Sequence, residues 1–277
     1  MTNYLLRYGE IFLKGKNRSF FEKKLIHNLK CYLKNQQVEG KITRLRNRLY
    51  AETSRAMDWK YVFGLTNYSP CVKIPANYMV IQNEVERMIQ DYTPKTTFRI
   101  TTNVMDPKYG MSKQEMNEKL GAFVVQQTKA RVNLKNYEEE IGIEVLQGHA
   151  YLYNKMIPCP GGLPVGVEGS ALLWVEDENS LLAGILAMKR GCAVFPVAQD
   201  KKDLTLLEKY AYGTKPTLKL LREVDLHEFI QHYEIQALVV GDTLTKIKEY
   251  PEISLPVLRP LVGYTKERVQ EEQRKYV

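Results

Sequence analysis

Apolar residues near the N-terminus follow first the period of a strand and then that of a helix. Alternate apolar positions from Tyr4 to Tyr8 predict a β-strand over residues 4–13. A basic turn is expected over 14–18, and a helix follows over about 18–34. The apolar stripe of this helix is expected to consist of Phe20, Leu25, Leu29 and Leu33.

The segments that follow alternate between strand and helix patterns. Strands are predicted over about 38–46, 48–53, 66–74, 96–104, 140–146 and 149–156. Helices are predicted near 55–62, over about 78–91 and over about 112–130. The expected core face of the helix over 78–91 is Met79, Val80, Val85, Met88 and Ile89. Gln147-Gly148 is typical of a hairpin turn. This order predicts two small α+β units, over 1–75 and 76–160.

The second part of the chain begins after a segment rich in proline and glycine, in which we place a linker at 161–169. Strands are then predicted over 170–175, 192–198, 217–222 and 235–241, with a further one near the C-terminus. Helices are predicted over 178–190, 203–212 and 225–232, with a last one at the end. Such alternation indicates an α/β domain over 170–277, with a parallel sheet covered on both faces.

Charge divides the chain unevenly. The net charge is +8, and residues 1–60 contain fourteen Lys/Arg against five Asp/Glu. A basic segment joined to a near-neutral remainder indicates a polyanionic partner, although a solvated basic surface is the simpler alternative. Hydrophobic residues at 44% and charged residues at 26% are ordinary for a globular protein, and no apolar run reaches membrane-spanning length.

Cysteine and histidine give no sign of a disulfide framework or a metal site. The four cysteines are Cys31, Cys71, Cys159 and Cys192. They are widely scattered and form no CxxC pair, which fits a reducing cytoplasm. We therefore expect a cytoplasmic protein without a bound metal. Cys159 is expected in the exposed linker, where a thiol could react, but no basic neighbour in sequence would activate it.

A strand–turn–helix at the start of the α/β domain is where nucleotide-binding domains place a phosphate loop. Such a loop needs glycine for close backbone approach, and the turn here contains none. Its residues are Val175, Glu176, Asp177, Glu178, Asn179 and Ser180. The three carboxylates favour the helix N-terminus and oppose a triphosphate. We interpret them as helix caps, with Ser180 as their partner, and a divalent cation that restores ATP binding is the alternative.

Several motifs in this sequence, taken together, resemble the tRNA 4-thiouridine synthetase (tRNA sulfurtransferase) family. They are YGEIFLKGKNRSFFEKKL near the N-terminus, FGL at 63–65, GGLPVG at 161–166, KRG at 189–191, VVGDTL at 239–244 and LPVLRPLVGYTKERV at 255–269. The resemblance implies a ferredoxin-like domain, a THUMP domain that holds tRNA with it, and a Rossmann-like, pyrophosphatase-type (PP-loop) domain. The family's loop, Ser-Gly-Gly-x-Asp-Ser, aligns with 175–180, where only Ser180 matches and Asn179 replaces the aspartate.

Basic residues in the first half are the candidates for RNA contact. They are Lys14, Lys16, Arg18, Lys23, Arg44, Arg46, Arg48 and Lys108. The first of these surround the strand–helix turn, where several cations can meet one phosphate backbone. Arg44, Arg46 and Arg48 are expected to alternate along one strand and share a face. The absence of an aromatic-rich stacking motif favours recognition of RNA shape and backbone.

Two hypotheses follow for the function. In the first, the chain binds tRNA and has lost its own ATP-dependent adenylation, so that it has no catalytic residue and no cofactor unless the altered loop still binds ATP. In the second, it is an active tRNA sulfurtransferase supplied by a separate sulfur donor. The expected partners are tRNA, a second copy of the chain, and a separate catalytic or sulfur-carrier protein, with no membrane.

Overall fold

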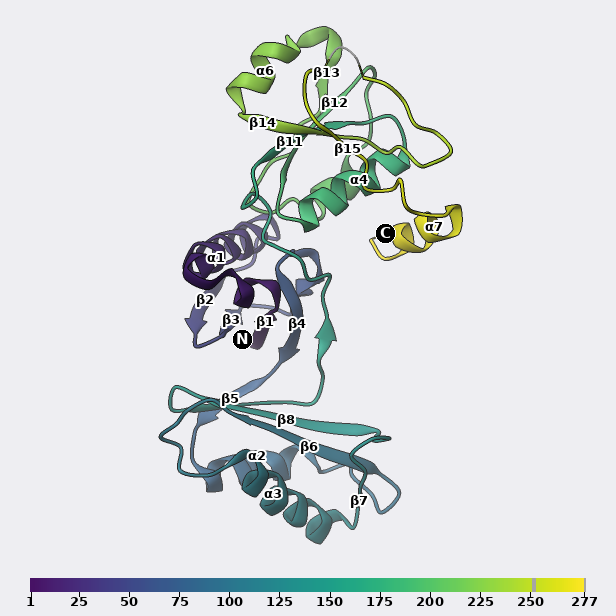
Figure 1. Ribbon diagram of the computed structural model, residues 1–277. Coiled ribbons are helices and arrows are strands. Elements are labelled where there is room, and N and C mark those ends of the chain that lie inside the picture. The colour runs from purple at the N-terminus through teal and green to yellow at the C-terminus, as the bar shows by residue number, and fades with distance from the viewer. Residues whose placement is uncertain (251–252, 277) are drawn as a thin grey trace. The chain divides into compact units, whose positions relative to one another are not determined.

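The computed structural model describes residues 1–250 and 253–276 (Figure 1). Its contacts divide the chain into two compact units. The first unit consists of Met1–Arg7, Val38–Met57 and Asn67–Pro158. The second unit consists of Tyr8–Gln37, Asp58–Thr66 and Cys159–Val277.

The N-terminal sheet has the strand order β10-β4-β1-β3-β2. Its strands are β1 (Thr2–Tyr8), β2 (Gly40–Leu45), β3 (Arg48–Thr53), β4 (Leu65–Pro70) and β10 (Ile157–Pro158). β3 pairs antiparallel with both β1 and β2. The β2–β3 hairpin turns at Asn47, whose φ of 63° is one that asparagine tolerates. The predicted strand over 66–74 is wrong as one element, because β4 ends at Pro70 and the next strand belongs to another sheet.

The second sheet of the first unit has the order β5-β9-β8-β6-β7. Its strands are β5 (Val72–Pro75), β6 (Thr97–Val104), β7 (Arg131–Val132), β8 (Glu139–Leu146) and β9 (His149–Tyr153). β6 and β8 are parallel, and the predicted hairpin at Gln147-Gly148 joins β8 to β9 with both residues at positive φ. The helices α2 (Tyr78–Met88) and α3 (Lys113–Thr128) lie on one face of this sheet (Figure 1).

The helices of this sheet confirm the predicted periods but correct one buried face. Met116, Leu120 and Val124 of α3 are buried as predicted. In α2 the exposed fractions of Met79 and Val80 are 59% and 37%, so these two residues lie outside the core. Val85 and Ile89 are buried as predicted, and Ile81, which was not predicted, completes the buried side. These three buried residues are four positions apart, as one face of a helix requires. Because residues 79–81 are all apolar, the sequence alone did not show which of them faces the core.

The second unit begins with a short 3-10 helix, η1 (Glu10–Asn17), followed by α1 (Arg18–Asn35). The helix α1 was predicted, but the expected strand at 9–13 is wrong, because the chain is helical from Glu10. Within the basic turn expected at 14–18, Gly15 is non-helical, with φ of 50° and ψ of −124°, and the chain kinks there. Phe20 is also misplaced: 56% of it is exposed, whereas Phe21 beside it is buried. The predicted helix near 55–62 shortens to a single 3-10 turn, η2 (Trp59–Tyr61).

The rest of the second unit is a parallel sheet of strand order β13-β12-β11-β14-β15. Its strands are β11 (Ser170–Trp174), β12 (Ala193–Ala198), β13 (Lys219–Leu220), β14 (Ile235–Val239) and β15 (Val257–Leu258). Its helices are α4 (Glu178–Lys189), α5 (Thr205–Glu208), η3 (Leu221–Glu223), α6 (Leu226–His232) and α7 (Lys266–Arg274). This arrangement confirms the predicted α/β domain.

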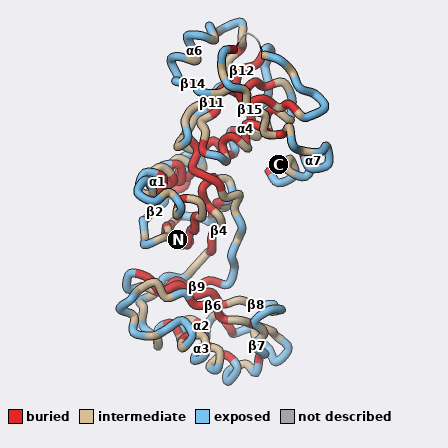
Figure 2. The backbone as a smooth tube through the Cα atoms, in the orientation of Figure 1, coloured by how far each residue is buried: buried red, intermediate tan, exposed pale blue. Residues whose placement is uncertain are grey.

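Alternating residues of β11 pack into the hydrophobic cores on the two faces of this sheet. Ala171 and Leu173 pack with the buried side of α4. Leu172 and Trp174 belong to the opposite core, which Phe229 of α6 borders. The buried stretches of β11 and α4 are red in Figure 2. Burial on both faces explains why β11 reads as a continuous apolar run.

Candidate functional site: the β11–α4 loop and the exposed cations

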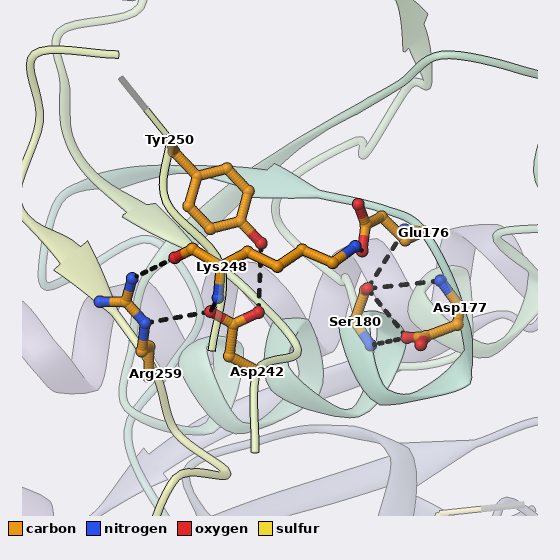
Figure 3. Close-up of polar contacts among 7 residues, drawn as sticks. All are labelled: Glu176, Asp177, Ser180, Asp242, Lys248, Tyr250 and Arg259. Carbon is orange, nitrogen blue, oxygen red and sulfur yellow. Dashed lines mark hydrogen bonds and ion pairs between the residues drawn. The ribbon is translucent and has the colours of Figure 1, made fainter. Parts of the chain in front are cut away.

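The loop between β11 and α4 lies at the carboxyl end of a parallel strand, where this class of fold binds ligands. Asp177 is the N-cap of α4, and its Oδ1 accepts a hydrogen bond from the Ser180 amide at 3.1 Å (Figure 3). The Ser180 hydroxyl in turn accepts from the amides of Glu176 and Asp177 at 3.1 and 3.4 Å. Three loop amides that could face an anion are thus bonded within the loop. The predicted role of the acids as caps is confirmed for Asp177.

Glu176 makes an ion pair with a residue that sequence reasoning did not select. Its Oε2 lies 2.5 Å from Nζ of Lys248, which comes from the segment after β14 (Figure 3). The hydrogen bond to Glu176 raises the pKa of Lys248 and keeps its ammonium protonated. Lys248 therefore neutralises one of the three loop carboxylates and is itself unavailable to a phosphate in this arrangement.

A second cluster beside the loop is centred on Asp242, which is buried with 5% exposed. Its Oδ2 accepts hydrogen bonds from Nε of Arg259 at 3.0 Å and from the Lys248 amide at 3.1 Å. Its Oδ1 accepts from the Tyr250 hydroxyl at 3.2 Å. Burial first, and then the charge of Asp242, raise the pKa of Tyr250. The cluster holds the Lys248–Tyr250 segment in place beside the loop.

The segment after β14 packs closely against the start of α4. A Cβ at Gly241 would lie 2.5 Å from the Ser180 amide nitrogen and 2.7 Å from the carbonyl carbon of Asn179. The chain after β14 therefore lies directly against the start of α4. Gln273 of α7 also donates a hydrogen bond to Asn179 Oδ1 at 3.3 Å. The loop is thus packed and hydrogen-bonded on several sides.

Metal ligation has little support at this site. Across residues 1–250 and 253–276, no three His, Cys, Asp or Glu side chains gather closely enough to hold a metal ion. The carboxylates of Glu176 and Asp242 have separate cationic partners, Lys248 and Arg259. Glu178, Asp177 and Glu176 therefore act as three individual groups rather than as one chelating set.

The predicted RNA-binding residues of the second unit fall into two kinds. Lys14 pairs with Glu168 at 2.8 Å and lies over the Phe21 ring. Arg18 is half-buried, and its Nε lies 2.8 Å from Glu22. Lys16 and Lys23 are exposed, so their ammonium groups are the more accessible. The structure thus separates cations already paired with protein from cations that face solvent.

In the first unit, the structure brings together two predicted residues that are far apart in sequence. Asp106 accepts hydrogen bonds from the amides of Gly148 and Lys108, at 2.9 and 3.1 Å. These bonds lower the pKa of Asp106, and the charges of Lys108 and Arg46 lower it further. Arg46 and Lys108 therefore lie near one carboxylate, at the turns that follow β2 and β6, and both are exposed.

The three alternating arginines do not share one strand as predicted. Arg44 is on β2 and is exposed, Arg46 is in the hairpin turn, and Arg48 begins β3. Nε of Arg48 lies 2.8 Å from Oε2 of Glu144, while Nε of Arg7 lies 2.7 Å from Oε1. Glu144 is buried on β8, so Arg48 belongs to a charged cluster that joins the two sheets of the first unit. Sequence periodicity carries no signal for such a long-range pairing.

The cysteines are placed differently from the expectation for a reactive thiol. Burial raises the pKa of both Cys71 and Cys159 to about 12. Cys159 is partly buried, and so it is not the exposed linker thiol that the sequence predicted. Its amide pairs with the Thr66 carbonyl at 2.8 Å, which draws it against the strand β4. A thiol that stays protonated is a poor nucleophile.

Comparison with known proteins agrees with this architecture. The family model for the ThiI ferredoxin-like domain matches residues 3–69, and the THUMP domain model matches residues 75–155. A crystal structure from Pyrococcus horikoshii Ot3 superposes with a TM-score of 0.89 at 28% identity, covering 99% of both chains. A crystal structure of a 4-thiouridine synthetase–RNA complex with bound ATP gives a TM-score of 0.79 at 21% identity, covering 100% of this chain and 85% of that one.

Curated relatives are also similar to this chain over most of its length. A probable tRNA sulfurtransferase of Natranaerobius thermophilus is 28% identical over 97% of this chain and 81% of its own length. One from Mycoplasmopsis synoviae is 32% identical over 80% of this chain and 59% of its own length. Fold and relatives define a THUMP-containing protein with a ferredoxin-like N-terminal domain and a parallel α/β domain. The chain belongs to the tRNA 4-thiouridine synthetase (tRNA sulfurtransferase) family.

Within the part of the chain that the structure describes, no helix is both long and apolar enough to cross a bilayer.

Proposed function

We propose that this protein binds tRNA through exposed cations of its first half and does not adenylate tRNA with its own β11–α4 loop. The observation that carries the proposal is the closed capping box, in which Asp177 and Ser180 use the loop amides. A phosphate loop works by presenting such amides to the anion at a helix N-terminus. Here the Asp177 carboxylate and the Ser180 hydroxyl already accept the hydrogen bonds of these amides.

Electrostatics supports the same conclusion. Lys248 neutralises Glu176, and Asp177 and Glu178 remain as exposed carboxylates at the loop. A like charge at roughly 4 Å, with an effective dielectric near 20, opposes an approaching phosphate by about 4 kcal/mol before screening. Before screening, each of the two remaining acids can therefore oppose a nucleotide by about as much as the binding free energy at a dissociation constant of 1 mM, which is about 4 kcal/mol.

Titration calorimetry with MgATP tests the loss of adenylation. The Natranaerobius thermophilus relative, measured in the same buffer, provides the reference. We expect no binding of MgATP at submillimolar concentration. A magnesium-dependent dissociation constant below 1 mM would refute the proposal.

RNA binding is supported by the THUMP domain and by the placement of the cations. The related synthetase was crystallised as an RNA complex, and we extend this partner to the present chain. Arg46, Lys108 and Arg44 are exposed in the first unit, and Lys16 and Lys23 in the second. Side chains of this kind neutralise phosphates without reading base identity.

Salt-dependent binding of tRNA tests this half of the proposal. The variant Arg44→Gln/Arg46→Gln/Lys108→Gln removes three cations and keeps polar side chains of similar length. Its slope of log affinity against log salt should fall by about two to three relative to the parent. A matched variant, Lys201→Gln/Lys202→Gln/Lys209→Gln, removes three exposed lysines of the α/β domain as a control. Equal slopes for parent and test variant would contradict the proposed contact surface.

The second candidate is an active tRNA sulfurtransferase that makes 4-thiouridine with a separate sulfur donor. Its support is the placement of two cations, Lys248 and Arg259, close to the β11–α4 loop. If a conformational change broke their carboxylate pairs, both could face a triphosphate. Analysis of 4-thiouridine in tRNA from cells lacking this protein distinguishes the two candidates. Loss of the nucleoside, restored by the parent but not by Lys248→Gln, would favour the enzyme.

We also propose that the chain forms a homodimer and works with a separate catalytic or sulfur-carrier protein, because a binding module without its own chemistry needs such a partner. Light scattering after size exclusion measures the mass in solution. A monomer mass of 32.1 kDa at all accessible concentrations would contradict the dimer.

A further inference from the structure

The thiol of Cys31 differs in its surroundings from the other three thiols of the chain. Its Sγ lies 3.5 Å from Nε2 of His27, one turn earlier on α1. Burial raises the pKa of Cys71, Cys159 and Cys192, so these three thiols stay protonated at neutral pH. An imidazole within hydrogen-bond reach is a partner that activates a thiol as a nucleophile. Cys31 and His27 therefore form a pair suited to nucleophilic chemistry.

The charges of α1 suit a thiolate at this position. Lys30 and Lys34 are exposed and lie beside Cys31 and one turn beyond it. Glu22 is the only acidic residue of α1, and its side chain is buried. Reactive cysteines are typically found in such electropositive and partly exposed surroundings.

A cavity of about 900 Å³ opens beside Cys31, which forms part of its wall. The rest of the wall comes from the loop after β12, from α5 and from the turn before β13, all within the second unit. Tyr212, Pro216 and Leu218 give the wall apolar surface. Sites for small molecules have volumes of roughly 300–1,000 Å³. The thiol therefore lies at the edge of a space large enough for a small molecule.

The charged residues of the cavity wall have both signs. Lys202 and Lys215 are exposed, and so are Asp203 and Glu208. The Asp203 carboxylate already accepts hydrogen bonds from the Thr205 amide and hydroxyl, at 2.8 and 2.6 Å. A small amino-acid or peptide thiol carries a complementary set of charges, with carboxylates for the two lysines and an ammonium for Glu208.

A buried acceptor without a partner lies behind the same wall. Asn28 precedes Cys31 by three residues on α1, and only 1% of it is exposed. Its Nδ2 donates to the Val165 carbonyl at 3.1 Å, but its Oδ1 has no hydrogen-bond partner in the part of the chain that the structure describes. This oxygen points at Gly213 of the cavity wall, where a Cβ would collide with it. Unpaired buried acceptors are uncommon, and a polar ligand in the adjoining cavity gives this one a functional explanation.

We propose that Cys31 is a site of S-thiolation, at which the protein takes up one half of a disulfide of a small amino-acid or peptide thiol. His27 Nε2 accepts the proton of the Cys31 thiol, and the resulting thiolate attacks one sulfur of the disulfide held in the cavity. The bond from Sγ to that sulfur forms as the S–S bond of the ligand breaks. The leaving thiolate takes the proton back from His27, so one disulfide replaces another and no further oxidant is needed.

This inference concerns a cavity of the second unit and goes beyond the proposed function. It does not depend on tRNA binding or on the β11–α4 loop.

Intact-mass spectrometry and peptide mapping after incubation with oxidised glutathione at neutral pH test the site on the full chain. The parent should gain one glutathione at Cys31 before the other three cysteines react, and Cys31→Ser should lose this adduct. His27→Gln should form it at least about threefold more slowly, because a smaller thiolate fraction is only partly offset by higher nucleophilicity. The control is His232→Gln, at an exposed histidine that does not line the cavity.

The charges of the wall are tested with two disulfides. Oxidised glutathione carries carboxylates and ammonium groups, whereas 2-hydroxyethyl disulfide carries no charge. Lys202→Gln/Lys215→Gln should slow the reaction of Cys31 with oxidised glutathione by about twofold or more and leave the reaction with 2-hydroxyethyl disulfide unchanged. The matched control, Lys201→Gln/Lys209→Gln, removes two exposed lysines of the same domain that do not line the cavity. Circular dichroism should be unchanged in each variant.

Three results would overturn the inference. The absence of an adduct in the parent, or an adduct that forms first at another cysteine, would refute the site. A parent-like rate in His27→Gln would refute the pairing of thiol and imidazole. If the lysine variant reacted with oxidised glutathione at the parent rate, or reacted more slowly with both disulfides, the cavity would not be the binding site. Each of these results leaves the proposed function untouched, because calorimetry with MgATP and tRNA binding test it separately.

Discussion

The buried carboxylate of Glu144 gives the sharpest test of how the first unit is held together. Its two oxygens pair with Nε of Arg7 at 2.7 Å and Nε of Arg48 at 2.8 Å. The exposed fractions of the Glu144, Arg7 and Arg48 side chains are 3%, 7% and 15%. Arg7 also donates hydrogen bonds to Asn67 and Ser69 and lies over the Tyr153 ring at 4.6 Å. The change Glu144→Gln keeps the shape and removes the charge.

The expected loss of stability is large because two guanidinium groups lose the buried carboxylate with which both of them pair. Removing one partner of a buried ion pair typically costs about 3–5 kcal/mol. An amide oxygen can still accept one hydrogen bond, so the lower half of that range is the firmer expectation. An exposed pair of the same unit, Lys119–Glu115 at 2.9 Å, provides the comparison. Glu115→Gln should leave the urea midpoint nearly unchanged, because water screens an exposed pair.

Urea unfolding followed by far-ultraviolet circular dichroism measures both changes. The two tryptophans of the chain, Trp59 and Trp174, lie in the second unit, so their fluorescence reports on that unit. Amide hydrogen exchange over β8 (Glu139–Leu146) reports on the first. In Glu144→Gln, amide hydrogen exchange over β8 should become much faster. The urea midpoint of tryptophan fluorescence, which reports on the second unit, should shift little. A loss below about 1 kcal/mol, or equal losses for Glu144→Gln and Glu115→Gln, would refute the assigned role of the cluster.

Three further predictions concern the cap, the thiols and one glycine. Asp177→Ala should destabilise the second unit by about 1 kcal/mol through loss of the N-cap, and an unchanged tryptophan-fluorescence midpoint in urea would contradict it. Burial raises the pKa of the Cys71 and Cys159 thiols to about 12, so both should resist iodoacetamide at pH 8 until urea unfolds the chain. Labelling at the rate of an unfolded thiol would show that they are accessible. Gly142→Ala should lower the free energy of unfolding by about 1–3 kcal/mol, because its Cβ would lie 2.1 Å from the Tyr153 ring. An unchanged urea midpoint in circular dichroism would contradict this prediction.

Local patterns predicted the elements well where one signal dominated. The helix over 18–34 appears as α1, and the turn at Gln147-Gly148 joins two strands as its residues predict. The helical period of apolar residues gave a wrong prediction at one position of α1. Phe20 and Phe21 are adjacent and equally apolar, so the helical period alone could not choose which of them faces the core. Packing in the folded chain made that choice, and it left Phe20 exposed.

The candidate sites show the same division more clearly. The sequence by itself determined that the β11–α4 loop has acids and no glycine, and that cations gather in the first part of the chain. Only the tertiary structure decided which of these charges are already satisfied. Glu176 meets Lys248 and Arg48 meets Glu144, across 72 and 96 residues of sequence. Charge is a property of each residue, whereas its availability depends on what the fold places within a few ångströms.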